Sequence, residues 1–234
     1  AQAPKFQGKD PNTNEADFAL VTAIPKELCI GDVVTFTFKG KVNIETMMST
    51  LRHHKDEKFN PQTSITEQDV CMHAGFGPVR ITQSTASMVV YLDQQQPIIF
   101  ATGTSAPCTS LFTPFWMGSA SFLNEEPVPT HQADANSLYW SHEKLHRAVL
   151  ENYQERLGAY LHERDELENR FIAGALKLQN ASPAERTEYS RACYAEKRTA
   201  EADWLKRVGA VPAKKSVLHS MAWTGYNRKA GLSG

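Results

Sequence analysis

The sequence has no run of apolar residues near the roughly 20 that a membrane-spanning helix needs, and no secretory signal segment. It also lacks a glycine-rich nucleotide loop and internal repeats. Neither charge dominates, because 25 Lys and Arg stand against 26 Asp and Glu. This balance argues against a general nucleic-acid or membrane-surface binder, which needs a basic field. The 4 cysteines are spread widely without a CxxC pair, which favours free thiols and a cytoplasmic location.

The chain is long enough, at 234 residues, to bury a substantial core. The pattern of apolar and polar residues changes near residue 137. Residues 1–136 hold short β-branched runs and turn residues behind a polar arm at 1–15, whereas residues 137–234 repeat apolar side chains every three or four positions. We therefore expect an α+β protein, with a sheet portion over 1–136 and a helical portion over 137–234.

Short patterns predict the elements of the sheet portion. Apolar runs at 88–92 and 98–101 flank the polar turn 93–97, which predicts an antiparallel hairpin. Strands are also predicted at 33–38 and around Val70. Asn43 is predicted to cap a helix that runs to about Leu51, with its apolar residues on one face. Residues 118–136 are predicted to form an irregular covering loop.

The helical portion is predicted to form an antiparallel hairpin, packed on the sheet or on a neighbouring subunit. Apolar periodicity over 138–178 predicts the first helix, in which Gly158 or Gly174 can mark a kink or break. The motif Ser182-Pro183-Ala184-Glu185 is typical of a helix start, and this second helix is expected to run to about Val208. The aromatic residues near 223–227 are predicted to dock as a tail.

Small hydroxyl residues stand on both sides of the predicted strand hairpin. One row precedes it and another follows it, and they comprise Thr82, Ser84, Thr85 and Ser87, then Thr102, Thr104, Ser105, Thr109 and Ser110. Both rows could present hydrogen-bonding groups to one cleft. Serine and threonine also occupy turns and strand ends for structural reasons, and composition alone favours that interpretation.

The pair Cys71 and His73 suggests chemistry, because residues two apart on a strand point to the same face. A zinc site needs three or four ligands, and His53 and His54 are the plausible additions. A catalytic thiolate–imidazole pair needs a third orienting group, and no carboxylate is evident. We therefore predict that Cys71 packs in the core, that His73 borders a substrate cleft, and that no metal is bound.

Arg80 follows a turn-forming segment, Gly75-Phe76-Gly77-Pro78. A guanidinium group at this place is a candidate for bidentate pairing with a substrate carboxylate. An exposed arginine at a strand edge is the equal alternative. Cys108 lies between Pro107 and Thr109, where a packed thiol is favoured over a reactive one.

Several fragments occur together in a specific order: ETMMSTLR at 45–52, VCMH at 70–73, TASMV at 85–89, TGTSAPCTSLFTP at 102–114 and YWSHE at 139–143. Together they resemble the secernin and dipeptidase family of cysteine amidohydrolases. The resemblance implies an αββα sandwich of the N-terminal-nucleophile hydrolases. It also implies that the thiol of a first-residue cysteine attacks an amide carbonyl while its α-amino group acts as base, with no metal or organic cofactor.

The chain departs from this family at the nucleophile, because Cys29, Cys71, Cys108 and Cys193 are all internal. The family's opening strand is not found in this sequence, and no arginine stands at 100–102, where related amidases place one. We therefore expect the C-terminal chain of a cleaved precursor, working in a hetero-oligomer with a companion chain that carries the cysteine.

In this hypothesis the substrate is a small amide or peptide. The pocket wall is assigned to five residues of this chain, which are His73, Arg80, Thr82, Thr85 and Ser87. Two alternatives remain open from the sequence. The first is a non-catalytic scaffold that assembles oligomers through its helical hairpin. The second is an acyltransferase that uses the same acyl-enzyme.

Overall fold

The computed structural model describes residues 18–21, 35–38, 42–54, 58–63, 69–75, 80–92 and 96–232. The chain divides into two units, residues 1–50 and 51–234. Their mixture of helices with small antiparallel sheets confirms the α+β class. The predicted polar arm at 1–15 and the centres of the turns at 76–79 and 93–95 lie outside the described residues. No helix in the described part is long and apolar enough to cross a membrane.

The first unit contains one strand pair and the start of a helix. Strands β1 (Phe18–Val21) and β2 (Thr35–Phe38) pair antiparallel, and β2 confirms the later part of the strand predicted at 33–38. Helix α1 (Ile44–Leu51) begins where it was predicted. Asn43 Oδ1 accepts a hydrogen bond from the Thr46 amide at 2.8 Å, and the Thr46 hydroxyl accepts one from the Asn43 amide at 2.9 Å. These reciprocal bonds satisfy amides that the first helical turn leaves free.

The second unit contains a three-stranded antiparallel sheet. Its order is β3 (Met88–Tyr91), β4 (Ile98–Ala101) and β5 (Thr113–Trp116). The β3–β4 pair confirms the predicted hairpin, with Val89 opposite Phe100. The strand predicted around Val70 is wrong, since residues 69–75 form an irregular loop. Its backbone bonds only at separate points, such as Cys71 N to His53 O at 3.3 Å and Ser84 N to Met72 O at 2.9 Å, so no ladder forms.

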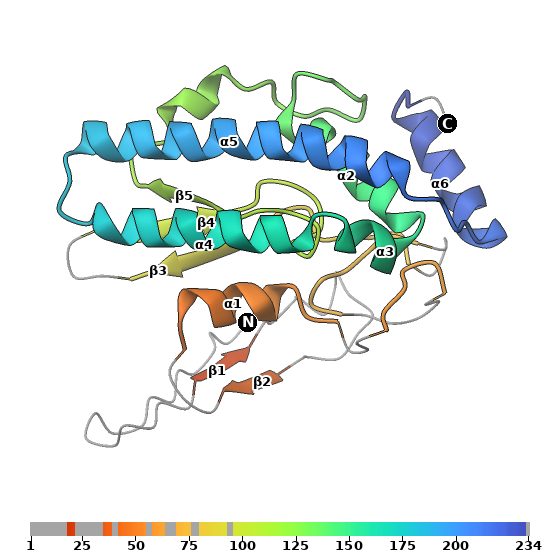
Figure 1. Cartoon of the computed structure of the whole chain (residues 1–234), viewed down its shortest axis with the longest axis horizontal. Coiled ribbons are helices and arrows are strands. Elements are labelled where there is room, and N and C mark those ends of the chain that lie inside the picture. The colour runs from red at the N-terminus through yellow and green to blue at the C-terminus, as the bar shows by residue number, and fades with distance from the viewer. Residues whose placement is uncertain are drawn as a thin grey trace, which may run out of the picture. The chain divides into compact units, whose positions relative to one another are not determined.

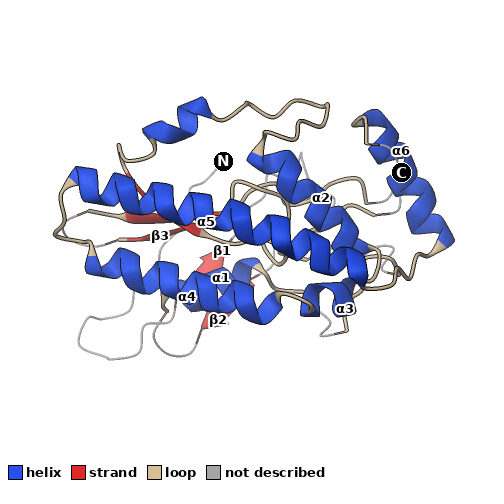
Figure 2. Cartoon of the chain, turned by 45° about the horizontal axis from the view of Figure 1, so that its top comes forward, coloured by secondary structure: helices blue, strands red, loops and turns tan. Residues whose placement is uncertain are grey.

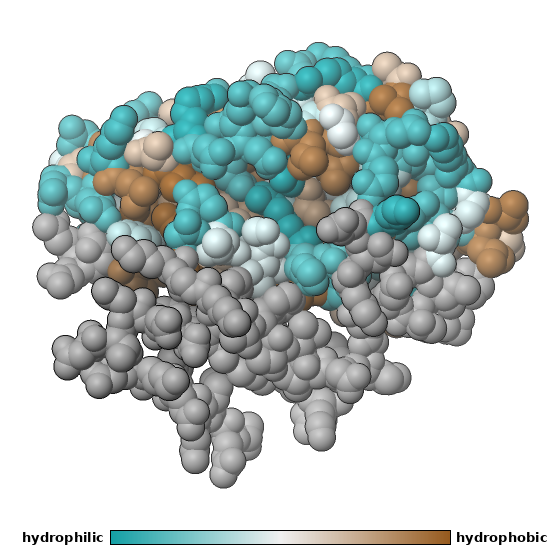
Figure 3. Space-filling view, turned by 60° about the horizontal axis from the view of Figure 1, so that its bottom comes forward, coloured by the Kyte–Doolittle hydropathy of each residue, from teal (hydrophilic) through white to brown (hydrophobic). Residues whose placement is uncertain are grey.

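The two faces of this sheet differ in burial. Side chains opposite one another across an antiparallel pair share a face, so the register assigns each residue to one side. One face is apolar and mostly buried, with Val89, Ile98, Phe100 and Trp116 at 5% exposure or less. The other face carries Met88 at 60% and Val90 at 40% exposure, beside the partly exposed Ile99, Ala101 and Phe115. Apolar patches interrupt the mostly hydrophilic surface of the molecule in Figure 3.

Helices pack against the buried face. Figure 1 shows α4 and α5 running antiparallel across the sheet, joined by a short connection at one end, and Figure 2 shows the same pair from above. The Arg186 guanidinium of α5 lies 5.9 Å from the ring centroid of Trp116. The helices are η1 (Ser121–Glu125), α2 (Leu138–Leu150), α3 (Tyr153–Gly158), α4 (Leu161–Lys177), α5 (Pro183–Ala210) and α6 (Val217–Lys229).

The predicted helical hairpin is confirmed in outline by α4 and α5. The long first helix is broken after Gly158, as predicted, whereas Gly174 lies inside α4. A second break at 151–152 was not predicted. There Arg156 donates to the carbonyl of Ala148 at 2.6 Å, which satisfies an acceptor that the break leaves free. The complete capping box at Ser182 and Glu185 starts α5 as expected.

The aromatic tail is itself helical, because α6 covers it. Trp223 is 7% exposed, so this residue docks as predicted. The predicted covering loop at 118–136 is mostly irregular and contains the short η1. The described residues contain a sheet with helices, but an αββα sandwich is not confirmed.

Candidate metal centre and cleft

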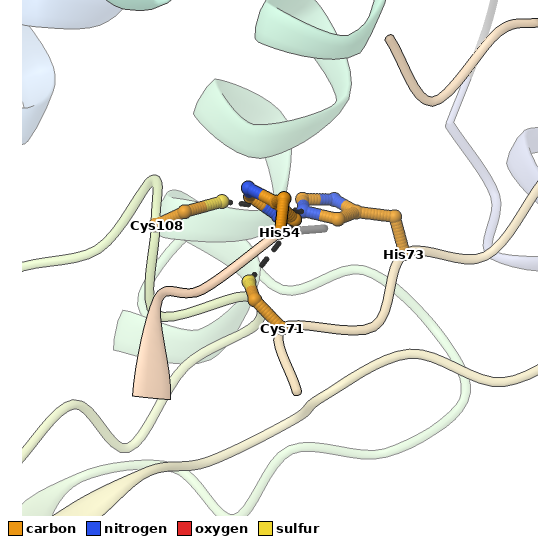
Figure 4. A group of neighbouring side chains, drawn as sticks. All are labelled: His54, Cys71, His73 and Cys108. Carbon is orange, nitrogen blue, oxygen red and sulfur yellow. Dashed lines mark hydrogen bonds between the residues drawn. The ribbon is translucent and has the colours of Figure 1, made fainter. Parts of the chain in front are cut away.

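Four side chains of the second unit converge on one point: His54, Cys71, His73 and Cys108 (Figure 4). They come from three loops, which follow α1, precede β3 and connect β4 to β5. Each offers one ligand atom, and all four atoms lie within 4.8 Å of one another. We call this group the Cys–His cluster.

The Nε2 atom of His73 has the closest contacts in the cluster. It lies 3.1 Å from His54 Nε2, 3.5 Å from Cys71 Sγ and 3.2 Å from Cys108 Sγ. Cys71, His73 and Cys108 are at most 5% exposed. All three cysteines that the described part contains, including the distant Cys193, are free thiols. The cluster is therefore a set of reduced sulfur and imidazole groups in which three members are buried and His54 is partly exposed.

Aromatic rings enclose the cluster. The Phe59 ring stacks on His54 with 4.1 Å between centroids and 3° between planes. Tyr153 meets His54 edge-on at 6.0 Å, and His146 stacks on His73 at 5.3 Å. This apolar surrounding limits water access and strengthens electrostatic interactions inside.

Buried charges fix the loop that carries Cys108. Arg52 Nε donates to Pro107 O at 2.8 Å and Arg52 Nη2 donates to Ser110 O at 3.1 Å, so this side chain binds both flanks of the cysteine. The same guanidinium forms two bonds with the Glu168 carboxylate, at 2.6 and 2.7 Å. Arg164 donates to the Cys108 carbonyl at 2.5 Å. The Cys108 backbone is therefore held from two elements.

The two thiols of the cluster have different electrostatics. Burial raises the pKa of Cys71 well above its ordinary value, and the neighbouring Cys108 adds to the shift. Burial alone would also raise the pKa of Cys108. The hydrogen bond from Cys71 and the nearby His73 and His54 rings outweigh burial, and they hold this pKa well below its ordinary value. Cys108 is therefore the thiol that ionises first.

A separate cleft of about 880 Å³ opens on the surface of the same unit. Its wall includes Thr82, Gln83 and Thr85 from the segment before β3, and aromatic residues from α2 and α6. These aromatic residues are Tyr139, Trp140, Trp223 and Tyr226. Such a mixture of aromatic surface with a few polar groups is typical of small-molecule sites.

Glu143 is the buried charge of this cleft, with 1% exposure. Its carboxylate accepts hydrogen bonds from Arg147 Nε at 3.0 Å and from Gln83 Nε2 at 3.2 Å. Burial alone would raise the pKa of Glu143, but His146 and Arg147 lower it below its ordinary value. The Arg147 guanidinium also lies 5.0 Å from the centroid of the Trp223 ring. The wall of the cleft therefore contains a buried, ionised carboxylate paired with the Arg147 cation.

The structure separates the five residues that the sequence assigned to a pocket wall. Thr82 and Thr85 line the cleft, whereas His73, Arg80 and Ser87 are not among its lining residues. His73 belongs to the Cys–His cluster. Arg80 is 5% exposed, so it is not an exposed edge residue, and its guanidinium donates to the carbonyl of Pro61. The Ser87 amide bonds to the Thr102 hydroxyl at 3.0 Å.

The two rows of hydroxyl residues do not share one cleft. The row after the hairpin is buried, with Thr102, Thr104, Ser105, Thr109 and Ser110 all at 2% exposure or less. Two of its bonds close the loop itself, Thr104 Oγ1 with Ser110 Oγ at 2.6 Å and Thr109 Oγ1 with Ala106 O at 3.0 Å. The Ser105 hydroxyl instead bonds to Gln83 at 3.0 Å and Tyr139 at 3.3 Å, behind the cleft wall. This row therefore shapes the loop that carries Cys108. The hydroxyl groups that reach the cleft come from the earlier row.

The functional residues that sequence reasoning missed are Cys108, in the cluster, and Glu143, in the cleft. Cys108 is buried in the core, as predicted for a packed thiol, but the sequence did not show that it faces His73. Glu143 carried no clear signal, since the buried face of α2 also contains the polar residues His142 and His146. No protein-family model, curated protein or solved structure matches this chain.

Proposed function

We propose that this chain is part of an amide-bond hydrolase of the N-terminal-nucleophile kind. A companion chain supplies the nucleophilic cysteine and the second sheet of the sandwich. The substrate is a small amide or peptide bound in the cleft at Thr82, Thr85 and Glu143. The chemistry comes from the resemblance of the sequence to cysteine amidohydrolases, and the asymmetry of the sheet is the structural observation that carries the proposal.

The sheet supports the proposal because its two faces differ in burial, although Thr113 on the more open face is buried and Tyr91 on the other is 37% exposed. Val89 and Phe100 are buried on the side of α4 and α5, whereas on the opposite side Met88 is 60% and Val90 is 40% exposed. Exposed apolar surface on a sheet marks an interaction site, and a second sheet packs about 10 Å away from such a face. Strand β3 also lies at the edge of the sheet and can add hydrogen bonds to a partner.

The cleft supports a substrate that carries both charges. The carboxylate of Glu143 suits a free amino group, and the Arg147 guanidinium beside it suits a carboxylate. A short peptide with free ends offers both groups. The aromatic walls, including Trp223, suit its apolar side chains.

In this reaction the cysteine thiolate of the companion chain attacks the amide carbonyl carbon. The C–N bond breaks, and the leaving amine takes a proton from the α-ammonium group of the same cysteine. Water then adds to the thioester and releases the acid and the thiol. This chain's groups bind and orient the substrate during both steps.

The test is capture of the tagged chain from its native cells, followed by sequencing of any stoichiometric partner and by amidase assays with and without a thiol-alkylating reagent. We expect a partner that begins with cysteine, together with peptide hydrolysis that alkylation abolishes. Val90→Lys places a charge on the exposed sheet face and should reduce partner recovery at least about tenfold, which corresponds to ~1.4 kcal/mol.

The matched control is Val217→Lys, because Val217 is also exposed, at 75%, but lies on α6. It should recover the partner as the unchanged chain does. A protein that is isolated without a cysteine-initiated partner and has no thiol-sensitive amidase activity would refute the proposal. Equal loss of the partner with both variants would refute the role of the sheet face.

A further inference from the structure

The Cys–His cluster is not needed for the proposed reaction, since its cysteines are internal and buried. Its four side chains nevertheless point toward one another from three loops (Figure 4). Two sulfur and two imidazole donors form the Cys₂His₂ set that zinc takes in structural sites. We propose that His54, Cys71, His73 and Cys108 bind one Zn²⁺ ion, and that this zinc fastens the three loops together.

The distances agree with a tetrahedral zinc centre. Zinc binds thiolate sulfur at about 2.3 Å and imidazole nitrogen at about 2.0 Å, so neighbouring ligand atoms of a tetrahedron lie ~3.3–3.8 Å apart. The three contacts of His73 Nε2 measure 3.1, 3.5 and 3.2 Å. All remaining ligand pairs lie within 4.8 Å. Shifts of a few tenths of an ångström to about one ångström place all four atoms around one ion.

Charge balance favours zinc at this buried position. Zn²⁺ with two thiolates and two neutral imidazoles has no net charge, and each thiol releases its proton to the solvent when its sulfur binds the metal. A neutral centre avoids the large cost of a lone buried ion. Soft thiolate ligands with imidazoles in a tetrahedron select zinc over magnesium or calcium, which prefer oxygen ligands.

The site is structural because it is closed. Four protein ligands fill a tetrahedron, whereas a catalytic zinc keeps one position for water or substrate. Phe59 and Tyr153 pack against the partly exposed His54, and the cluster does not line the cleft. Ala74 does line the cleft, directly after His73 in the chain. Zinc at the cluster therefore holds this part of the cleft wall in place without touching the substrate.

Two further outcomes are chemically possible at such a cluster. Oxidation by an external oxidant, with loss of one hydrogen atom from each thiol, would join Cys71 to Cys108 as a disulfide. An acyl acceptor role for Cys108 would need access for a substrate, and Cys108 is 5% exposed. Bound zinc would suppress both the oxidation of the two thiols and an attack by Cys108. Zinc content and thiol reactivity, measured together, therefore distinguish metal binding from these two outcomes.

The first test needs no variant. The 234-residue chain, purified without chelator or metal-affinity resin, should contain about one zinc per chain by elemental analysis. Alkylation mapped by mass spectrometry should show Cys71 and Cys108 protected by zinc and released by a chelator. Cys193 is the internal control, because this buried free thiol lies away from the cluster and should react equally in both conditions.

The second test replaces zinc with Co²⁺ after chelation. Tetrahedral cobalt with two thiolates should give intense visible bands and a sulfur-to-metal charge-transfer band that saturate at one equivalent, and zinc should abolish both. Cys108→Ser should weaken cobalt binding by more than ~100-fold, since even losses outside the ligand set cost 10–100-fold. Cys193→Ser should bind as the unchanged chain does.

Three results would each overturn the proposal. They are a zinc content far below one ion per chain, alkylation of Cys71 and Cys108 at the same rate with and without zinc, and a chain mass lower by two hydrogens because a Cys71–Cys108 disulfide has formed. The protection experiment on the unchanged chain decides the question even if Cys108→Ser does not fold. Failure here would leave the amidase proposal standing, because that proposal depends on a companion cysteine and on the cleft.

Discussion

The Cys–His cluster and the cleft belong to the same unit but differ in how they meet solvent. In the cluster, four donor atoms of two kinds face one another, and three of the four residues are buried. In the cleft, Glu143 and Arg147 lie among aromatic side chains at an opening of about 880 Å³. A closed set of ligands suits an ion that stays bound, whereas an open site with paired charges suits a molecule that enters and leaves.

The two sites also differ in the interactions that hold their side chains in place. The loop of Cys108 is fixed by buried ion pairs, including Arg52 with Glu168. The cleft is bounded by α6, whose His219 is a buried histidine with a lowered pKa. Damage to the support of the cluster should therefore cost stability first, and damage at the cleft should change binding first.

The largest effect is expected for Arg52→Gln. This change leaves the Glu168 carboxylate buried without its cation and removes the bonds to both flanks of Cys108. Breaking a buried pair from one side typically costs about 3–5 kcal/mol. Urea unfolding of the purified chain measures the loss. Arg170→Gln is the matched control, because the Arg170–Glu196 pair is mostly exposed and should matter by less than about 1 kcal/mol. Equal losses of unfolding free energy in the two variants would contradict the expected difference between the buried and the exposed ion pair.

A smaller effect is expected for Glu143→Gln, which keeps the shape of the side chain but removes its charge. For the native complex we expect KM to rise about tenfold for a peptide with a free amino group, since a bond to a charged group contributes about 1.5–3 kcal/mol. An N-acetylated peptide should show no such rise. Glu188→Gln, at an exposed site on α5, is the control variant. The cobalt spectrum of the cluster should not change; if it does, the two sites are not separate.

A loss of stability that occurs only at acidic pH is expected from His219. Burial lowers the pKa of His219 to about 4, and Arg80 adds to this shift. The unfolded chain, in which histidine titrates near 6.5, therefore binds more protons between pH 6.5 and about 4. Stability should consequently fall as the pH decreases through this window. His219→Asn should make that fall shallower, as followed by Trp fluorescence during urea unfolding. An unchanged pH profile would show that His219 is not responsible.

The smallest effect on stability is expected for Thr85→Val. Thr85 is exposed and lines the cleft, so the free energy of unfolding should change by less than about 0.5 kcal/mol. Peptide binding by the native complex should weaken if this hydroxyl contacts the substrate. The buried counterpart Thr104→Val removes the bond to Ser110 and should cost about 1–3 kcal/mol. Equal stability of the two variants would contradict the distinction between the two hydroxyl rows.

The sequence correctly predicted those helices and strands that depend on interactions between residues close together in the chain. Asn43 and Ser182 start helices because their side chains bond amides of the first turn, and the apolar runs of β3 and β4 pair across a polar turn. The prediction of a strand at Val70 was wrong, because the backbone there forms isolated hydrogen bonds to separate loops and not the regular series of hydrogen bonds of a β-sheet. Cys71 and His73 nevertheless meet, at 3.5 Å, but within an irregular loop and not on the strand from which a shared face was inferred.

The cluster could not be completed from the sequence, because its members come from three loops whose approach depends on tertiary packing. Cys108 reaches His73 only because charged groups such as Arg164 hold its loop. The sequence likewise left open whether the two hydroxyl rows face one cleft or serve turns and strand ends, since composition does not reveal burial. Residue types are readable from a sequence, but the convergence of distant loops requires the fold.

Native mass spectrometry of the protein isolated from its own cells is the decisive measurement, since it keeps both metal and partner bound. We expect one complex in which this chain carries one zinc ion and is joined by a chain that begins with cysteine. A lone, metal-free chain would contradict both proposals. Zinc without a partner, or a partner without zinc, would contradict one of them and identify which.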